Sequence, residues 1–380
     1  MSEENYSFQK TYTLLPQSPL IHFQWNQDGA ALRATEVKPK LDRYIVRRYG
    51  KPIPDDWKNK QSPNALKYKM RIVTCEETTA LKLGRNTDYK IYFANMNEKK
   101  EKNKNNQKKG IFVKMSLTVT CFIPELLKYI NEIIGDFFVV SNFGTMQDKG
   151  FGSYLVEDKS EYSHEQIASL LKDEYGCRNV YFFSIFVRDD ERKDKLEEEI
   201  QKSIQKCLFN NIKVLHNTLK SGNAFSPKTQ SLLYKYLYEK VDPNLKSEKE
   251  WLNYRATTLE SAYVRALMGV SDHMGTVDIP VAIASTALKD DKIERVPSPI
   301  WFIVVKNNVY FVGRRIPEEL YGAQFEFKSE SKKFNSGKLN VPDKTVIGED
   351  FIDKYLAYAV DQLNDMYINR NFRFRVKEVK

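Results

Sequence analysis

The sequence has few of the residues that build metal sites, disulfide frameworks or membrane spans. Only four of its 380 residues are cysteines and only four are histidines. The cysteines are widely separated and form no Cys-x-x-Cys pair; they are Cys75, Cys121, Cys177 and Cys207. Scattered cysteines of this kind indicate buried thiols in a reducing compartment, not a zinc site or disulfides. We therefore expect no structural metal, no bound cofactor and a cytoplasmic protein.

Long apolar runs are absent as well. A membrane-spanning helix needs ~20 consecutive apolar residues, and no segment of the chain approaches that length. The first seven residues are polar and acidic, which does not fit a secretory signal peptide. We expect no contact with a membrane.

What is present is the composition of a folded, basic protein. Hydrophobic residues make up 41% of the chain and aromatic residues 13%, which predicts a globular core. A length of 380 residues predicts two domains. Sixty lysines and arginines exceed fifty acidic residues, so the net charge is +10 and acidic partners are favoured.

Half of this positive excess lies in residues 33–51, where seven basic residues stand against two acidic ones, a net of +5. An apolar stripe at helical spacing predicts a helix that begins near Lys38; the stripe is formed by Val37, Leu41, Tyr44 and Ile45. A separate basic stripe on this helix is formed by Lys40, Arg43 and Arg47. Such a stripe is usually a solvated face, but the scarcity of acidic neighbours makes contact with phosphate groups an equal alternative.

A glycine-punctuated loop spans residues 142–154, with glycines at Gly144, Gly150 and Gly152. Glycine has no Cβ, so these positions permit positive φ and let successive amides point at an anion. Lys149 adds a charge, and Phe151 adds a ring on which a base can stack. The loop is neither a Walker A motif nor a dinucleotide fingerprint. Its alternative interpretation is a hairpin turn whose glycines satisfy geometry only.

The first half of the chain alternates strand and helix patterns. Strands are predicted at residues 11–15, 66–75, 89–94, 111–122 and 137–140. A helix is predicted to begin at Pro124 and to end at Gly135. The lysine-rich segment 97–109 has no hydrophobic residue, which predicts a disordered hairpin tip. The order of strand, helix, strands, helix and strand is that of a ferredoxin-like unit.

The same order begins again in the second half. Strands are predicted at residues 180–187, 301–306, 309–312 and 372–377, with a hairpin turn at Asn307-Asn308. Helices are predicted at about 189–219, 226–267 and 349–366, and residues 271–294 predict loops. We therefore expect an α+β protein with tandem ferredoxin-like (RRM-like) domains at 1–175 and 176–380. The second domain is expected to carry a helical insertion at about 190–295.

Three segments resemble the RAMP superfamily of CRISPR-associated proteins, and they occur along the chain in the order that they have in that family. Residues 144–153, with their Gly-Phe-Gly-Ser core, resemble the G-loop of that family. Residues 32–43 resemble the basic segment after its first strand, and Ser298-Pro299 resembles the step into a hairpin of its second domain. The chain departs from the family at residues 145–148, where many members carry more arginine and lysine.

The resemblance implies a role in antiviral defense. It implies a non-catalytic RNA-binding subunit of a type III CRISPR ribonucleoprotein effector, similar to the two-domain proteins of the Cmr module. Its partners would be CRISPR guide RNA and other RAMP subunits. The basic helix and the glycine loop are then expected to hold the guide backbone through Arg33, Lys38, Lys40, Arg43, Arg47, Arg48, Gly144, Lys149, Gly150, Phe151, Gly152 and Ser153.

Two other functions stay open. Some related endoribonucleases cleave CRISPR repeats without metal by means of a histidine near the start of the first domain. His22 stands where such a general acid or base would lie. The alternative for His22 is a side chain packed among Ile21, Phe23 and Trp25. The basic faces would also suit a scaffold that binds an acidic protein partner.

Overall fold

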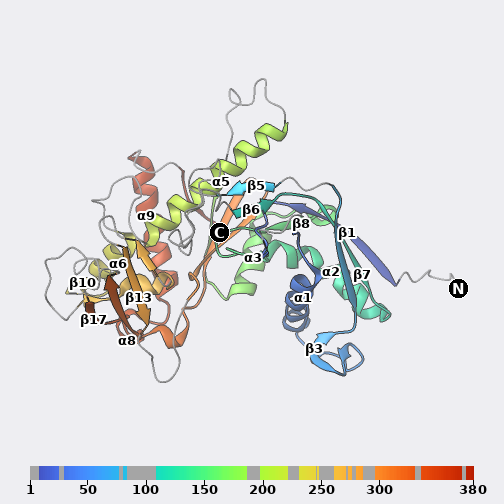
Figure 1. Cartoon of the computed structure of the whole chain (residues 1–380), viewed down its shortest axis with the longest axis horizontal. Coiled ribbons are helices and arrows are strands. Elements are labelled where there is room, and N and C mark those ends of the chain that lie inside the picture. Colours follow the sequence, from blue (N-terminus) through green and yellow to red (C-terminus); the bar gives the residue numbers. More distant parts are fainter. Residues whose placement is uncertain are drawn as a thin grey trace. The chain divides into compact units, whose positions relative to one another are not determined.

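The computed structural model describes most of the chain (Figure 1). The described residues are 8–24, 30–76, 80–83, 108–185, 197–220, 231–244, 246–247, 261–270, 273–275, 280–285, 296–329, 335–369 and 374–380. They form an α+β protein with mostly antiparallel sheets, as the sequence predicted. Two compact units contain them. The first lies within Met1–Leu83, Gln107–Glu174 and Phe302–Tyr310, and the second within Tyr175–Trp301 and Phe311–Lys380.

A four-stranded antiparallel sheet forms the centre of the first unit (Figure 1). Its order is β4-β7-β1-β8, and its strands are β1 (Gln9–Pro16), β4 (Lys69–Thr74), β7 (Met115–Thr120) and β8 (Tyr154–Val156). On β7, buried residues alternate with half-buried ones, the buried set being Met115, Leu117 and Val119. The predicted alternation within 111–122 is confirmed for this strand.

Helices α1 (Ala34–Tyr49) and α2 (Pro124–Val140) pack against this sheet and against each other. The buried side of α1 includes the whole predicted apolar stripe, Val37, Leu41, Tyr44 and Ile45. The Tyr44 ring lies 5.5 Å from the Phe137 ring of α2. Helix α1 begins one turn earlier than predicted, and Gly50 ends it in the left-handed conformation with φ 66°.

Helix α2 is longer than predicted, so the strand expected at 137–140 is wrong. These four residues are buried in the last turn of the helix. Gly135 does not end the helix but lies inside it, where a Cβ would stand 2.6 Å from Tyr162 Oη and 2.9 Å from Lys159 Cβ. The glycine therefore allows close packing, and burial of the following residues overrides their local preference for strand.

Shorter elements complete the first unit. Strand β2 (Lys58–Asn59) pairs with β3 (Ser62–Leu66), and β5 (Ala80–Leu83) pairs with β6 (Lys108–Ile111). The 3-10 helix η1 (Glu157–Lys159) and helix α3 (His164–Tyr175) follow β8. The strand predicted at 89–94 lies outside the described residues. The lysine-rich segment 97–109 lies outside them too, except for its last two residues, which belong to β6.

The second unit contains helices α5 (Glu197–Lys220), α6 (Leu232–Lys240) and α9 (Phe351–Ile368). The Tyr236 ring of α6 lies 5.9 Å from the Phe351 ring and 5.6 Å from the Tyr355 ring of α9. Tyr355 Oη donates a 2.5 Å hydrogen bond to the Leu219 carbonyl oxygen near the end of α5. No helix among the described residues has the length and apolar character that a membrane crossing needs.

A second four-stranded sheet has the order β14-β15-β9-β18. Its strands are β9 (Val180–Ser184), β14 (Ile300–Val305), β15 (Asn308–Gly313) and β18 (Lys377–Glu378). The predicted hairpin is confirmed, although its turn is Lys306-Asn307, with φ 54° at Lys306. Of the strand predicted at 372–377, residues 372 and 373 lie outside the described residues, and only Lys377 is in β18.

The predicted helical insertion also contains strands. A third sheet has the order β12-β13-β16-β17, with strands β12 (His273–Gly275), β13 (Pro280–Ser285), β16 (Gln324–Ser329) and β17 (Asn335–Asn340). The prediction of loops at 271–294 is therefore wrong for β12 and β13. The helix predicted over 226–267 is also wrong beyond α6, where the described elements are β10 (Lys246–Ser247), β11 (Ser261–Ala262) and the 3-10 helix η2 (Val264–Met268). These strands pair with residues far along the chain, as Val281 does with Ser329, so their local sequence shows no hydrophobic period that would predict them.

Two short helical elements follow in the same half of the chain. They are the 3-10 helix η3 (Glu318–Leu320) and helix α8 (Lys344–Ile347). The Asp343 side chain caps α8 by accepting the Thr345 backbone N–H at 3.0 Å.

Gly135→Ala is expected to destabilise the protein, although alanine is the better helix former. The added Cβ would meet Tyr162 Oη and Lys159 Cβ. Overpacking of this kind costs about 1–3 kcal/mol, against a gain of about 1 kcal/mol for alanine over glycine in a helix. Urea unfolding measures the net loss. A Tyr162→Phe background removes the closest atom and should reduce the loss, and an equal loss in both backgrounds contradicts the packing explanation.

Candidate nucleic-acid interface

The glycine loop has the backbone conformation that its sequence predicted. Gly144, Gly150 and Gly152 all have positive φ, at 75°, 78° and 71°. The ends of the loop are joined by a bridge between Asn142 and Ser153, with the Phe143 N–H donating to the Gly152 carbonyl at 3.0 Å. The loop is therefore a closed turn whose two ends lie side by side.

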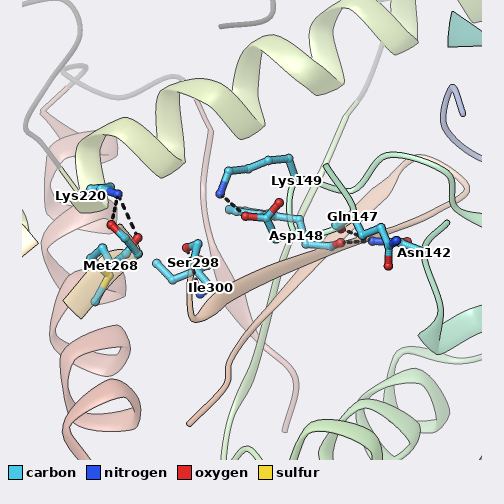
Figure 2. Close-up of polar contacts among 10 residues, drawn as sticks. Asn142, Gln147, Asp148, Lys149, Lys220, Met268, Ser298 and Ile300 are labelled. Atoms are coloured by element: carbon cyan, nitrogen blue, oxygen red, sulfur yellow. Dashed lines mark hydrogen bonds and ion pairs between the residues drawn. The ribbon is translucent and has the colours of Figure 1, made fainter. Parts of the chain in front are cut away.

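The Asn142 side chain holds this loop together from a position that is only 1% exposed. Its Nδ2 donates to the carbonyl oxygens of Gln147 at 2.6 Å and Phe302 at 2.7 Å (Figure 2). Its Oδ1 accepts a 2.6 Å hydrogen bond from Ser153 Oγ. The Ser153 N–H in turn donates to Ser18 Oγ at 2.9 Å. The polar groups at the base of the loop are thus paired within the chain.

The loop amides that a phosphate would need also have partners inside the protein. The Gly144 N–H donates to Glu36 Oε1 at 2.6 Å, so a carboxylate of α1 takes the place of an external anion. Four further amides donate to backbone carbonyls; they belong to Thr145, Lys149, Gly150 and Gly152. The conformation fits an anion-binding turn, but these five donors are already used.

Neither Phe151 nor Lys149 presents its functional group openly. The Phe151 ring is 1% exposed, so the expectation of a ring free for base stacking is wrong, because the ring belongs to the core. Lys149 Nζ pairs with the neighbouring Asp148 carboxylate at 2.8 Å (Figure 2). Burial lowers the pKa of Lys149, while Asp148 opposes the shift.

Lys40 ties helix α1 to the loop. Its Nζ donates to the Asn142 carbonyl and to Gln147 Oε1, both at 2.7 Å, and lies 4.7 Å from the centre of the Phe143 ring. Burial lowers the pKa of Lys40 to about 8, with Glu36 opposing the shift. This lysine, predicted to contact RNA, is a cross-link between two parts of the fold.

Three further basic residues of α1 are ion-paired. Lys38 Nζ lies 2.7 Å from Asp42 Oδ2 and donates to the Leu66 carbonyl at 3.0 Å. Near the end of α1, Arg47 pairs with Glu174, and Arg48 Nη1 lies 2.7 Å from Asp173 Oδ2. Both acids lie on α3, more than 120 residues away along the chain. The sequence near α1 therefore does not predict these two ion pairs.

Arg33 and Arg43 differ from these residues. Both are exposed, and no acidic residue in the described part of the chain forms an ion pair with either. Arg33 is the residue that precedes α1, and Arg43 lies on the helix where it lines a hollow. Of the predicted basic set on the helix, these two are the cations open to a ligand.

The hollow has a volume of about 1260 Å³ and is bounded by α1, β2, β3 and the first residue of β4. Figure 1 shows α1 beside β3. Seven basic residues line it, and we call it the basic groove: Lys38, Arg43, Arg47, Lys51, Lys58, Lys67 and Lys69. Its one acidic lining residue, Asp42, is already paired with Lys38. Three of the seven are ion-paired, Lys38 with Asp42, Arg47 with Glu174 and Lys58 with Asp55. The groove therefore owes its net positive charge to Arg43, Lys51, Lys67 and Lys69.

Three groove lysines that were not singled out from the sequence are exposed: Lys51, Lys67 and Lys69. Within the described residues, none of the three forms an ion pair. A signal for two of them was present, because Lys67, Lys69 and Arg71 alternate with Tyr68 and Met70 and share one face of an extended segment. The alternation that predicts the strand therefore also places these basic side chains on its outer face.

His22 is packed rather than open, at 5% exposed. Its Nδ1 accepts a 3.0 Å hydrogen bond from the Gln24 N–H, and its ring meets the Phe23 ring edge-on at 6.2 Å. Burial, and then Arg33, lower its pKa, whereas Glu36 raises it. Trp25, the third expected neighbour, lies outside the described residues. Among those residues, no group of three or more His, Cys, Asp or Glu side chains is placed to hold a metal ion.

Comparison with known families covers nearly the whole chain. Residues 7–223 match the family model of the Cmr1 N-terminal domain, and residues 228–380 match that of the Cmr1 C-terminal domain. No curated protein matches the chain. The family matches confirm the resemblance to a type III, Cmr-like RAMP subunit.

Gly152→Ala is expected to destabilise the protein far more than Gly176→Ala. Both glycines have positive φ, so both variants carry the ~1–2 kcal/mol cost of left-handed backbone. At Gly152 a Cβ would also stand 2.1 Å from the Phe143 carbonyl oxygen, whereas at Gly176 it would meet nothing within 4 Å. Chemical unfolding of the two variants measures the difference. Equal losses would mean that the close approach of the two loop ends is not needed.

The low pKa of Lys40 predicts a pH dependence of stability. Its pKa is about 8 in the folded protein against an ordinary value of 10.5. Between these values the unfolded chain binds the proton that the folded chain has released, so the free energy of unfolding rises with pH. Relative to Lys40→Met, the wild type should gain about 1–2 kcal/mol between pH 7 and pH 9.5. Unfolding curves that run parallel for the two proteins contradict this.

Proposed function

Because the chain belongs to the Cmr1 family of type III CRISPR effector subunits, we propose that it is a non-catalytic subunit that holds CRISPR guide RNA by its backbone in the basic groove. The observation that supports this is the charge of the groove, where Arg43, Lys51, Lys67 and Lys69 form no ion pair in the described chain and the single lining acid is paired with Lys38. Phosphate contacts of this kind position an RNA strand without reading its sequence.

The contact residues that we propose differ in part from those expected from the sequence. Arg43 remains, and Lys51, Lys67 and Lys69 join it in the groove, because these side chains are exposed and unpaired within the described chain. Arg33, exposed at the start of α1, remains a proposed contact outside the groove lining. We propose that Lys40 and the glycine loop 144–153 act indirectly by holding α1 in place. Lys38, Arg47 and Arg48 would add positive potential while they remain paired.

We further infer two tandem ferredoxin-like domains, with a boundary near residue 175. The elements β1, α1, β4, β7, α2 and β8 follow the ferredoxin-like order of strand, helix, two strands, helix and strand. The elements β9, α5, β14, β15, α9 and β18 follow it again. The two sheets also share one spatial order. When the four strands of each domain are counted along the chain, the second strand lies at the edge and is followed by the third, the first and the fourth. The two units divide between Glu174 and Tyr175, which supports this boundary, although residues 302–310 group with the first unit.

The proposed partners are guide RNA and other RAMP subunits of the same effector, in the cytoplasm. Family membership supports the assembly with other subunits. A groove lined by exposed lysines would also attract an acidic protein surface. The salt dependence of RNA binding by groove variants separates these two candidates. If the groove binds an acidic protein and not RNA, removing its lysines should leave RNA binding unchanged.

Binding of fluorescent single-stranded RNA across a salt series tests the proposed groove. Each phosphate contact on a single strand contributes a slope of about −0.7 in log affinity against log salt. The triple variant Lys51/Lys67/Lys69→Ala is therefore expected to bind more weakly, with a slope about two units shallower than that of the wild type.

The matched control removes the same charge elsewhere. Lys10, Lys128 and Lys240 are exposed, lie outside the groove lining and form no ion pair in the described chain. Lys10/Lys128/Lys240→Ala should leave the slope within a few tenths of that of the wild type. Identical curves for the two triple variants would remove the groove from the RNA path.

A further inference from the structure

The basic groove has an exposed aromatic ring at its rim. Phe122 follows β7, lines the groove and is 74% exposed. Its ring lies 5.4 Å from the ring of Phe8, with an angle of 46° between the two planes. Phe8 is itself 47% exposed, so the two rings form an exposed aromatic pair at the rim of the groove.

The exposure of Phe122 is built into the fold. The neighbouring Cys121 is buried, and its N–H donates to the Phe8 carbonyl at 2.8 Å. Cys121 Sγ also donates to the carbonyl oxygens of Lys67 and Ile123, each at 3.4 Å. Phe122 follows in a bend between β7 and α2, and its ring is left exposed while Cys121 is held on the inner side.

Cations flank this ring. Lys69 pairs in the sheet with Thr120, two residues before Phe122, and the Lys67 carbonyl contacts Cys121. Arg43 lines the same groove from α1, and so does Val46, which is also exposed. A positive groove combined with an aromatic platform is the arrangement that binds single-stranded nucleic acid, because cations follow the backbone and rings stack on bases.

The size and shape of the groove agree with this ligand. Pockets of about 300–1,000 Å³ hold drug-sized molecules, so a hollow of about 1260 Å³ has room for more than one nucleotide. In a duplex the base faces are covered by their neighbours, and proteins recognise such RNA by its shape and backbone. A ring at the rim can stack only on a base that is unpaired.

We propose that Phe122 stacks on an unpaired base of an RNA strand whose backbone lies along Lys67, Lys69 and Arg43, so that the groove selects single-stranded RNA over duplex. The inference rests on the proposed RNA-binding function and adds to it the strandedness of the ligand and the residue that recognises it. Neither the glycine loop nor the predicted basic stripe contains this residue.

The test uses the full-length protein and an oligouridine strand with 2-aminopurine at every third position. Stacking on Phe122 should quench the 2-aminopurine fluorescence of the wild-type complex. Phe122→Ala should lose this quenching and weaken single-strand binding by about tenfold, as expected for the loss of one stacked base. It should leave the affinity for a duplex and the salt slope unchanged, and Phe122→Trp should restore both quenching and affinity.

Phe23→Ala is the matched control, since Phe23 is 62% exposed but does not line the groove. It should behave as the wild type. Thermal unfolding checks that both variants fold, which is expected because neither ring is in the core. Unchanged quenching and affinity in Phe122→Ala, or an equal loss of duplex binding, would overturn the proposal. If Phe122→Ala has no effect but Lys51/Lys67/Lys69→Ala still flattens the salt slope, the stacking proposal fails and the proposed groove function stands. If the wild type does not bind RNA at all, both proposals fail.

Discussion

The side chain of Asn142 is the polar contact on which the geometry of the first unit depends. Its carboxamide joins the carbonyl of Gln147, the carbonyl of Phe302 and the hydroxyl of Ser153, and its own backbone carbonyl accepts from Lys40. Leaving a buried polar group without a partner costs about 1–3 kcal/mol. Three segments that are distant in sequence, namely the loop 142–154, α1 and the strand at Phe302, are therefore held in one arrangement.

This network occupies much of the hydrogen-bonding capacity of a loop that has the sequence of a ligand-binding turn. The side chains of Asn142 and Ser153 bond to each other, and the Glu36 carboxylate accepts the Gly144 amide that an external anion would otherwise meet. Gly152 is required because the Phe143 carbonyl oxygen of the other loop end would lie 2.1 Å from a Cβ, and Gly144 because the Ile21 carbonyl oxygen would lie 2.4 Å from one. The exposed cations lie instead on α1 and the neighbouring strands.

Ion pairing decides which basic residues remain available. Arg47 and Arg48 face the acids of α3, whereas Lys67 and Lys69 have no such partner within the described chain. Net charge and clustering along the sequence do not distinguish these cases. The unpaired cations therefore lie not on the helix alone but in the groove between α1 and the neighbouring strands, where Phe122 adds an apolar face.

The sequence alone was sufficient to predict features with a local cause. The apolar stripe of α1, the alternation of β7, the β14-β15 hairpin and the positive φ of the loop glycines each depend on residues close together in the chain. Tertiary structure alone decided that residues 137–140 finish a helix, that β12 and β13 are strands, and that Lys40 is half-buried against the glycine loop. The last two outcomes depend on partners far along the chain, such as Ser329 opposite Val281 and Asn142 beside Lys40, and a local pattern carries no record of them.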